Sequence, residues 1–274
     1  MKDTFINRLL VNVLGIPGIL LLLWLGGIYF ACFIGLVVLI ALWEFYNING
    51  KKAVRPQVWV GLLAALPVVA MYFTGIPTSA ALISGIIVFV LIVLSYEMFR
   101  NLPGATANIA VTIAGVLYIP TLLGTLVALR VWDTTVGSHL TFAVFVSVWI
   151  CDSAAYAFGK QWGRKKMAER ISPKKTVVGC VGGVAGAFLT YAIIYKTGYL
   201  GGPFGIIDIV VFSIITGIFG QAGDFAQSLI KRDMGVKDSG ALLMAHGGVF
   251  DRFDSLLFAG PLTFAYVYFI HGII

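Results

Sequence analysis

Long runs of apolar residues, interrupted only by short polar segments, fill most of this 274-residue chain. Hydrophobic residues make up 59% of the sequence and charged residues 11%, whereas roughly a quarter of a soluble domain is charged. A helix needs about 20 apolar residues to cross a bilayer, and it satisfies its own backbone hydrogen bonds. The runs lack the alternation of a membrane β-barrel. The sequence therefore predicts an all-α, polytopic bundle of transmembrane helices that forms one integral membrane domain over residues 1–274.

Proline, glycine and charged residues divide the apolar runs into about nine candidate spans. Near the N-terminus, GIPGILLLLWLGGIYF permits either a tight helical hairpin or one bent helix. A signal peptide is not expected, because the apolar sequence continues without a small-residue cleavage site. The candidate spans are residues 9–25, 28–46, 57–74, 79–98, 107–128, 138–158, 178–197, 205–226 and 253–272.

The lysines and arginines predict the orientation of these spans. A cytoplasmic N-terminus places 17 of the 19 basic residues in cytoplasmic segments, and only Arg130 and Lys196 fall outside. This asymmetry follows the positive-inside rule. The net charge of +7 is therefore interpreted as topology and affinity for anionic membrane lipids. Nucleic-acid binding is not expected, because no basic soluble domain is present. The expected location is the plasma (bacterial inner) membrane, with the charged loops in the cytoplasm.

Charge is concentrated in residues 223–255, which hold five of the twelve acidic residues, four basic residues and one histidine. A membrane protein keeps such charge where there is water, a metal or a charged substrate. Asp224 is expected to end the eighth helix, and Asp251 and Asp254 lie where the ninth is expected to begin. Carboxylates at facing helix ends offer hard oxygen ligands for Mg²⁺. The segment therefore predicts a metal-bridged anionic substrate at one membrane face.

A second charged segment covers residues 152–176. Asp152 lies within an otherwise apolar helix, where a carboxylate costs several kcal/mol unless it is paired or hydrated. A functional role is therefore favoured for Asp152. The loop that follows contains seven lysines and arginines, and the positive-inside rule explains several of them equally well. Those with this simpler explanation are Lys160, Lys165, Lys166 and Arg170.

The polar positions of the two segments form two motifs. The first contains Ser228, Lys231, Arg232, Lys237, Asp238, the triplet His246, Gly247 and Gly248, then Asp251, Arg252 and Asp254. The second contains Asp152, Ser153, Ala154, Ala155, Tyr156, Gly159, Gly163 and the run Ser172, Pro173, Lys174, Lys175 and Thr176. Both resemble motifs of the phosphatidate cytidylyltransferase family, also called CDP-diacylglycerol synthases. The motifs cover most of residues 152–255, whereas the N-terminal half resembles the family only in being hydrophobic and helical.

The resemblance implies transfer of CMP from CTP to phosphatidic acid, giving CDP-diacylglycerol and pyrophosphate for phospholipid synthesis. It implies Mg²⁺ as cofactor, with a second cation left open, and it is compatible with a homodimer. Residues 1–130 would be mainly scaffold, and residues 138–274 would carry catalysis. The implied metal ligands are Asp224 and Asp251. The implied catalytic residues are Asp224, Lys231, Arg232, Lys237, Asp238, His246, Asp251, Arg252 and Asp254. The implied substrate-binding residues are Asp152, Ser172, Lys174, Lys175, Thr176, Ser228, Gly247 and Gly248.

The chain departs from the family pattern at two places. Met244 and Ala245 stand where the family usually has a small residue and a glycine before the His-Gly-Gly turn. Val177 and Val178 stand where an acid usually follows the Lys-Lys-Thr run. The first departure would change how the loop bends, and the second removes a polar contact.

Two other functions compete with this interpretation. A transporter of an anionic solute would also place charge within the membrane. Against it, the charges cluster at one face, and the spans near residues 57–128 are expected to be almost free of buried ionisable groups. Glu44 and Glu97 are expected close to cytoplasmic helix ends, where they can reach water. Another lipid-phosphate transferase, such as a CDP-alcohol phosphotransferase or a polyprenol kinase, is the second alternative. The aspartate run typical of the CDP-alcohol enzymes is not present in the sequence.

Overall fold

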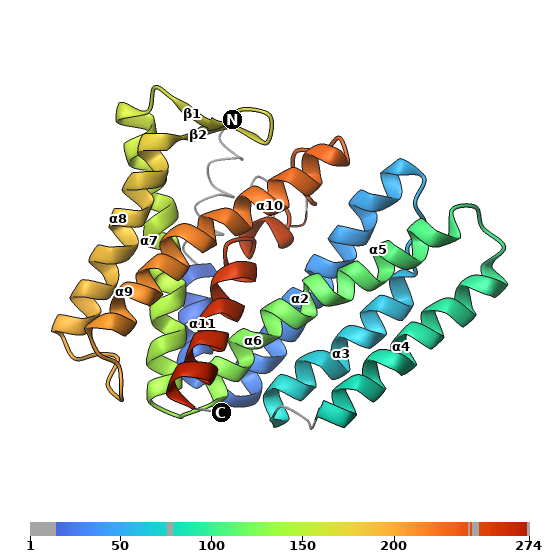
Figure 1. The fold of residues 1–274 in the computed structure, drawn as a ribbon, viewed down its shortest axis with the longest axis horizontal. Helices are drawn as coiled ribbons and strands as arrows, with labels where there is room; N and C mark the ends of the chain where they lie inside the picture. Colours follow the sequence, from blue (N-terminus) through green and yellow to red (C-terminus); the bar gives the residue numbers. More distant parts are fainter. Residues whose placement is uncertain (1–14, 76–78, 241, 243–246, 273–274) are drawn as a thin grey trace.

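The chain folds almost entirely into helices (Figure 1), in a computed structural model that describes residues 15–75, 79–240, 242 and 247–272. A short apolar helix, Gly15–Leu25, comes first. The elements that follow are α2 (Gly27–Asn49), η1 (Gly50–Lys52), α3 (Val58–Thr74), α4 (Ser79–Arg100), α5 (Ala105–Tyr118), α6 (Pro120–Val131), α7 (Val136–Trp162), β1 (Lys166–Ala168), β2 (Ser172–Thr176), α8 (Val177–Lys196), α9 (Ile206–Ile214), η2 (Ile215–Phe219), α10 (Gly220–Asp233), η4 (Phe250–Arg252) and α11 (Leu256–His271).

The helices confirm the expected class of protein, a helical membrane protein. Six described segments are helical, long enough and apolar enough to cross a bilayer: Gly27–Lys52, Ser79–Arg100, Ala105–Val131, Val136–Trp162, Val177–Lys196 and Ile206–Asp233. Gly15–Leu25, Val58–Thr74 and Leu256–His271 are shorter apolar helices. An antiparallel hairpin of β1 and β2 is the exception to the all-α prediction.

Two helix boundaries differ from the prediction. Asp224 does not end a helix, because α10 continues to Asp233. Asp251 and Asp254 precede α11, which begins at Leu256. Hydropathy marks where apolar sequence stops, whereas an amphipathic helix continues through polar residues until its backbone is interrupted. Here the interruption is Gly235, with φ of 69°, the left-handed conformation that commonly follows a helix end.

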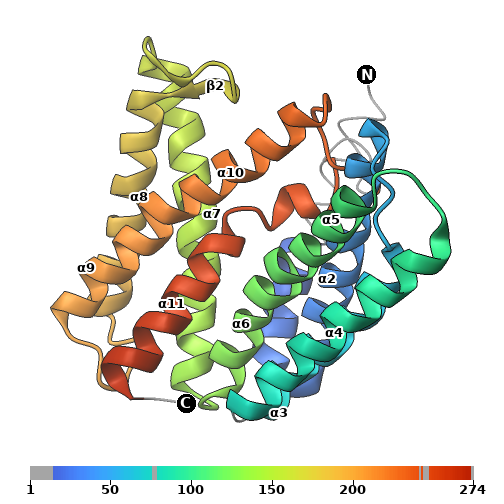
Figure 2. The same cartoon turned by 45° about the vertical axis from the view of Figure 1, so that its right-hand side comes forward.

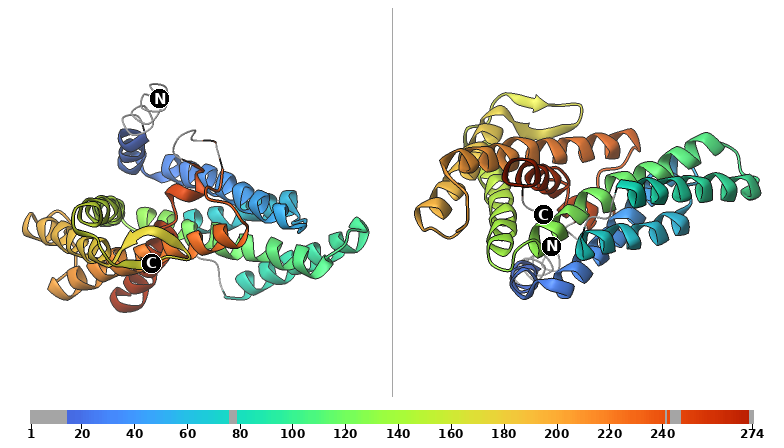
Figure 3. Two further views of the ribbon diagram at one scale, coloured as in Figure 1. Left: turned by 90° about the horizontal axis from the view of Figure 1, so that it is seen from above. Right: turned by 60° about the horizontal axis from the view of Figure 1, so that its bottom comes forward.

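The β1–β2 hairpin, η1 and the end of α10 bring charged residues together at one end of the molecule. The β1–β2 hairpin lies beside the end of α10 in Figures 1 and 2, and Arg232 on α10 donates to the carbonyl oxygen of Ile171 in the hairpin turn. Lys52, after α2, pairs with Asp233 at 3.1 Å. Figure 3 shows that α4 and α5 extend to the side opposite α8 and α9. The polar end is therefore built from both halves of the chain.

Helices α7 and α8 pack closely because α8 presents glycines to α7. A Cβ at Gly182 would overlap the side chain of Phe158, and one at Gly183 would press against Cys151. Small residues let membrane helices approach closely, and dispersion contacts then hold them together. This packing brings Asp152, on α7, within electrostatic range of Lys175 on the strand that leads into α8.

Arg130, one of the two cations outside the predicted cytoplasmic segments, is buried and has hydrogen-bond partners in another helix. Its Nε donates to the carbonyl oxygen of Leu23 at 2.7 Å, and its Nη2 donates to that of Trp24 at 3.2 Å. The last carbonyl groups of a helix have no partner within the helix. Arg130 therefore satisfies the C-terminal end of Gly15–Leu25, a structural role for a buried charge.

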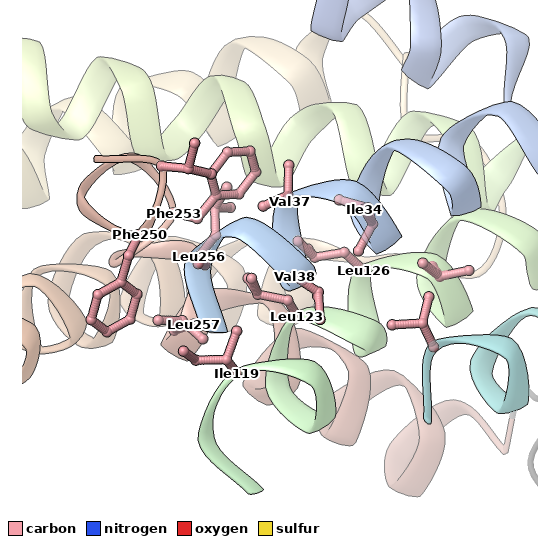
Figure 4. Close-up of a cluster of buried hydrophobic side chains, with 14 of the residues drawn as sticks. Ile34, Val37, Val38, Ile119, Leu123, Leu126, Phe250, Phe253, Leu256 and Leu257 are labelled. Atoms are coloured by element: carbon pink, nitrogen blue, oxygen red, sulfur yellow. The ribbon is translucent and has the colours of Figure 1, made fainter. Parts of the chain in front are cut away.

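The segment between α10 and α11, residues 234–255, is anchored in the hydrophobic core. Phe250 and Phe253 pack among side chains of α2, α6 and α11 (Figure 4). The Phe250 ring meets the Phe45 ring edge to face, at 6.1 Å between centroids. The non-helical end of the site therefore depends on the packing of α2.

The glutamates expected to reach water are buried: Glu44 is 1% exposed and Glu97 is 6% exposed. That prediction was wrong, because hydropathy estimates depth in the membrane and not the side chains that cover a position. Glu97 accepts hydrogen bonds from Gln57, Asn108 and Arg100 at 2.7 to 2.8 Å. It joins α4 to α5 and to the start of α3.

Tyr46 of α2 is buried between two glycines. A Cβ at Gly61 of α3 or at Gly115 of α5 would overlap the Tyr46 side chain. The Tyr46 hydroxyl donates to the carbonyl oxygen of Thr112 at 2.7 Å. Both neighbours must therefore lack a side chain for the ring to fit.

We expect Gly115→Ala to lower the free energy of unfolding by about 1–3 kcal/mol, because the ring cannot move away from an added methyl group. Gly85→Ala is the matched control, since a Cβ at Gly85 on α4 meets no heavy atom within 4 Å. The measurement is thermal unfolding in detergent. Equal stability of the two variants would contradict this account of the packing.

Candidate active site

Asp251 connects three parts of the polar end. Its Oδ1 accepts from Lys231 Nζ at 2.6 Å and from Gln227 Nε2 at 3.0 Å, both on α10. Its Oδ2 lies 2.8 Å from the Ser239 amide, 3.0 Å from Ser239 Oγ and 3.0 Å from the Gly248 amide. A carboxylate offers about four lone-pair sites. The hydrogen-bonding capacity of Asp251 is therefore filled by protein donors.

These donors set the ionisation of Asp251. Burial works to raise the pKa of this carboxyl, but hydrogen bonds from Lys231, Gly248 and Ser239 outweigh burial and hold its pKa below the usual range. The ion pair with Lys231 is largely buried, since the two side chains are 7% and 9% exposed. Asp251 is thus a fixed anion that orders the residues around it.

The paired glycines before Asp251 are required for two different reasons. Gly247 has φ of 80°, a conformation that glycine adopts without a steric cost. Gly248 has no room for a side chain, because a Cβ there would overlap Glu44 and Ser239. Its amide donates to Asp251 Oδ2. In this state the Gly248 amide is therefore not free to bind a phosphate.

Asp224 lies on α10 and pairs with the hairpin. Its Oδ2 is 2.5 Å from Lys175 Nζ on β2, and both side chains are about a quarter exposed. Ser228, one turn further along α10, donates to Asp224 Oδ1 at 3.3 Å. Lys175 also lies over the ring of Phe225, 4.3 Å from its centroid. The pairing fixes the hairpin against α10 and places a cation and an anion together at the surface.

Asp254 lies in a region of negative charge. Burial, together with the charges of Asp224 and Asp152, raises its pKa well above the usual range. The Ser255 amide donates to Asp254 Oδ1 at 2.7 Å, but this hydrogen bond does not offset those effects. Asp152 on α7, Asp224 on α10 and Asp254 before α11 thus repel one another. They come from both predicted motifs, so the two motifs lie close together here. Among the described residues, no three His, Cys, Asp or Glu side chains form a ready metal-binding group.

Thr176 at the end of β2 has a structural contact. It is buried, and its Oγ1 accepts from the Gly179 amide at 3.1 Å, so it is the N-cap of α8. Because Gly163 has no side chain, it leaves space for the side chain of Thr176. Lys174 on the same strand is exposed, whereas Ser172 is partly exposed. Val177 and Val178 form the exposed first turn of α8.

The remaining described residues that the sequence predicted for the site are exposed to solvent. Arg232 is exposed and bonds to backbone carbonyl oxygens of Ile171 and Val236. Lys237, Asp238 and Arg252 are exposed. His246, Met244 and Ala245 lie outside the described residues.

Three residues at the site were not predicted: Gln227, Ser239 and Glu44. Gln227 and Ser239 bond directly to Asp251, and Glu44 bonds to Ser239. Gln227 could have been predicted, because it is a polar residue one helical turn before Lys231 on the same face of α10. Glu44 carried no signal, because the contact joins residues 195 positions apart.

The fold and the site define a polytopic helical membrane protein with a charged, hydrogen-bonded site at one end of the bundle. The chain belongs to the cytidylyltransferase family, whose model matches residues 6–270. It is similar to proteins named phosphatidate cytidylyltransferase. The Synechocystis protein is 32% identical, over 95% of this chain and 96% of its own length. The Staphylococcus aureus and Staphylococcus haemolyticus proteins are 30% and 31% identical, each over 93% of this chain and 96% of its own length.

We expect Thr176→Val to lower the free energy of unfolding by about 1 kcal/mol, because valine keeps the shape but leaves the Gly179 amide without its cap. Thr190→Val in the same helix is the matched control. Thr190 is also buried, but its hydroxyl donates to a carbonyl oxygen within α8, and that carbonyl keeps its helical hydrogen bond. Thermal unfolding in detergent measures both. A fully stable Thr176→Val variant would contradict the capping role.

Proposed function

We propose that this chain transfers CMP from CTP to phosphatidic acid and releases pyrophosphate. The observation that carries the proposal is the match to phosphatidate cytidylyltransferases over nearly the whole chain. It is supported by the meeting of Asp152, Lys175, Asp224 and Asp254 at one end of the bundle. The product that remains in the membrane is CDP-diacylglycerol.

The chemistry requires little from a general base. The second pKa of a phosphate monoester is about 6, so the lipid phosphate is largely dianionic near neutral pH. One of its oxygens attacks the α-phosphorus of CTP, and the bond from that phosphorus to the α–β bridging oxygen breaks. Pyrophosphate leaves with the electron pair of that bond. The protein contributes by aligning the two phosphates and by stabilising the charge that develops on pyrophosphate.

We assign the charge stabilisation to basic residues at the polar end. Lys175 lies at the surface beside Asp224, and Lys231 is held by Asp251. The exposed cations around them are suited to contact triphosphate or lipid phosphate, as is the triplet that contains His246. These cations are Lys174, Arg232, Lys237 and Arg252.

A divalent cation fits the carboxylates of the site. The repulsion that raises the pKa of Asp254 comes from Asp224 and Asp152, and Mg²⁺ would neutralise it while stabilising the leaving pyrophosphate. We propose Asp224 and Asp251 as ligands, with Asp254 as a further ligand or as the holder of a bound water. Asp251 differs from the other two, because an ion at its Oδ1 would have to replace Lys231. A second cation remains part of the proposal.

We also propose that the chain has nine spans, with its N-terminus and its charged site in the cytoplasm of a bacterium. The six long and three shorter apolar helices support the number of spans. The concentration of lysine and arginine in the hairpin and at the end of α10 supports the orientation. CTP would reach the site from the cytoplasm and phosphatidic acid from the membrane.

We expect the purified full-length chain to release pyrophosphate only when CTP and phosphatidic acid are both present. Lys175→Met should lower kcat/KM for CTP by about tenfold or more, because it removes a charge-assisted contact at the phosphates. Lys166→Met, at an exposed lysine of β1 in the same hairpin, should remain close to the native rate. Release without CTP dependence would overturn the proposed function, and equal rates of the two variants would overturn the role of Lys175.

We expect Mg²⁺ to raise the thermal unfolding temperature of the native chain, since a ligand that binds only the folded state stabilises it. Asp254→Asn should be more stable than the native chain in EDTA, because one repelling carboxylate is gone, and its response to Mg²⁺ should be smaller. Asp233→Asn is the control, at an exposed carboxylate paired with Lys52. An identical Mg²⁺ response in all three proteins would contradict a cation at these carboxylates.

A further inference from the structure

Glu44 is a buried acid outside both sequence motifs. It lies near the C-terminal end of α2, 1% exposed, in the half of the chain expected to be scaffold. A buried carboxyl group in a membrane protein is costly unless polar partners replace water. Its partners therefore indicate what it does.

In the part of the chain that the structure describes, the hydrogen-bond partners of Glu44 lie between α10 and α11. Its Oε1 accepts from the Val249 amide at 3.0 Å. Its Oε2 accepts from the Phe250 amide at 2.9 Å and from Ser239 Oγ at 2.9 Å. Ser239 comes before the His-Gly-Gly triplet, and Val249 and Phe250 come directly after it. One side chain thus holds Ser239 close to Val249 and Phe250.

Ser239 extends this contact to Asp251. Its Oγ is 2.9 Å from Glu44 Oε2 and 3.0 Å from Asp251 Oδ2. A hydroxyl has one proton, so it donates to one carboxyl group at a time, while the Ser239 amide donates to Asp251 at 2.8 Å. The position of the Asp251 carboxylate is therefore set from one side by α10 and from the other by Glu44 through Ser239.

The surrounding chain is shaped to admit the Glu44 side chain. A Cβ at Gly240 or at Gly248 would overlap the Glu44 carboxyl group. Phe250 packs on Phe45 and Tyr118 independently of Glu44, at 6.1 and 6.0 Å between ring centroids. Hydrophobic packing thus keeps the segment against α2, whereas the Glu44 carboxyl group determines its local geometry.

We propose that Glu44 is a positioning residue for the proposed reaction: it fixes Ser239, Val249 and Phe250, and through them Asp251, in the geometry that binds the triphosphate of CTP. The proposal rests on the proposed function for the ligand, but the contacts themselves do not depend on it. Glu44 touches no substrate, and it acts through Ser239 and two backbone amides.

The decisive variant is Glu44→Gln, which keeps the size but replaces one acceptor oxygen with a donor. Both Glu44 oxygens face N–H groups, so either orientation of the amide opposes a donor to a donor. We expect kcat/KM for CTP to fall about tenfold or more, since small misplacements near reacting groups have effects of that order. The KM for phosphatidic acid should change less than about twofold, because only the nucleotide side is displaced.

Glu97→Gln is the matched control. Glu97 is also buried and accepts hydrogen bonds from three side chains, but none belongs to residues 234–255. It should lower thermal stability without a selective loss of CTP use. The same selective loss in both variants would mean that any buried glutamate produces it, which would overturn the proposal.

A second measurement does not depend on activity. Hydrogen–deuterium exchange of the full-length chain should become faster in peptides covering residues 247–253 of Glu44→Gln and remain unchanged in α8. Unchanged exchange in residues 247–253 would overturn the proposal even if activity falls. If the native chain shows no CTP dependence, the proposed function fails, while the exchange result still decides whether Glu44 positions these residues.

If Glu44→Gln does not fold, Ser239→Ala provides the test. This variant removes the hydroxyl between Glu44 and Asp251 and keeps the backbone amide on Asp251. We expect a smaller loss of kcat/KM for CTP, about threefold, because one of the three Glu44 contacts is removed. Native kinetics and native exchange in Ser239→Ala would overturn the proposal.

Discussion

The hydrogen bonds to Asp251 hold the non-helical part of the site together. In a membrane protein, irregular backbone must find partners within the protein, and the described residues between α10 and α11 are largely irregular apart from the short η4 (Phe250–Arg252). Asp251 accepts from α10 through Lys231 and Gln227, and from its own segment through Ser239 and Gly248. One carboxylate thus replaces a regular hydrogen-bond pattern. The positions of Lys231, Ser239 and Gly248 all depend on it.

Glu44 applies the same principle from the other side. Its carboxyl group accepts hydrogen bonds from two backbone amides and one hydroxyl, so the residues on either side of Asp251's contacts are also held by an acid on α2. Acids suit this purpose because each oxygen accepts more than one hydrogen bond, and amide donors reduce the cost of burying a carboxyl group. Gly247 and Gly248 come shortly before Asp251. Gly247 provides the backbone conformation, and Gly248 leaves space for the Glu44 carboxyl group. The glycines and the acids therefore depend on one another.

The sequence predicted the helical membrane class because apolar length and backbone satisfaction leave few alternatives. It also predicted residues that converge from distant segments, such as Asp152 on α7, Lys175 on β2 and Asp224 on α10. It could not predict which of them pair, since Lys175 with Asp224 and Lys231 with Asp251 are set by packing of α7, α8 and α10. Glu44 was misplaced because hydropathy gives no information about a partner that lies 195 residues away. Helix ends were misplaced where polar residues continue a helix, as in α10.

Asp251 and Asp254 have opposite electrostatic surroundings, which give the two carboxylates different roles. Donors from all sides lower the pKa of Asp251, so its charge is already compensated by the protein. Asp254 has the reverse environment, because burial and the neighbouring acids raise its pKa. Lys231 offsets part of the negative charge around Asp254, Lys175 and Arg252 act on Asp152, and Lys175 pairs directly with Asp224. The cation proposed for this site would add to this compensation, since it would balance several carboxylates at once. Asp251 and Asp254 therefore lie three residues apart in sequence but differ in how their charge is balanced.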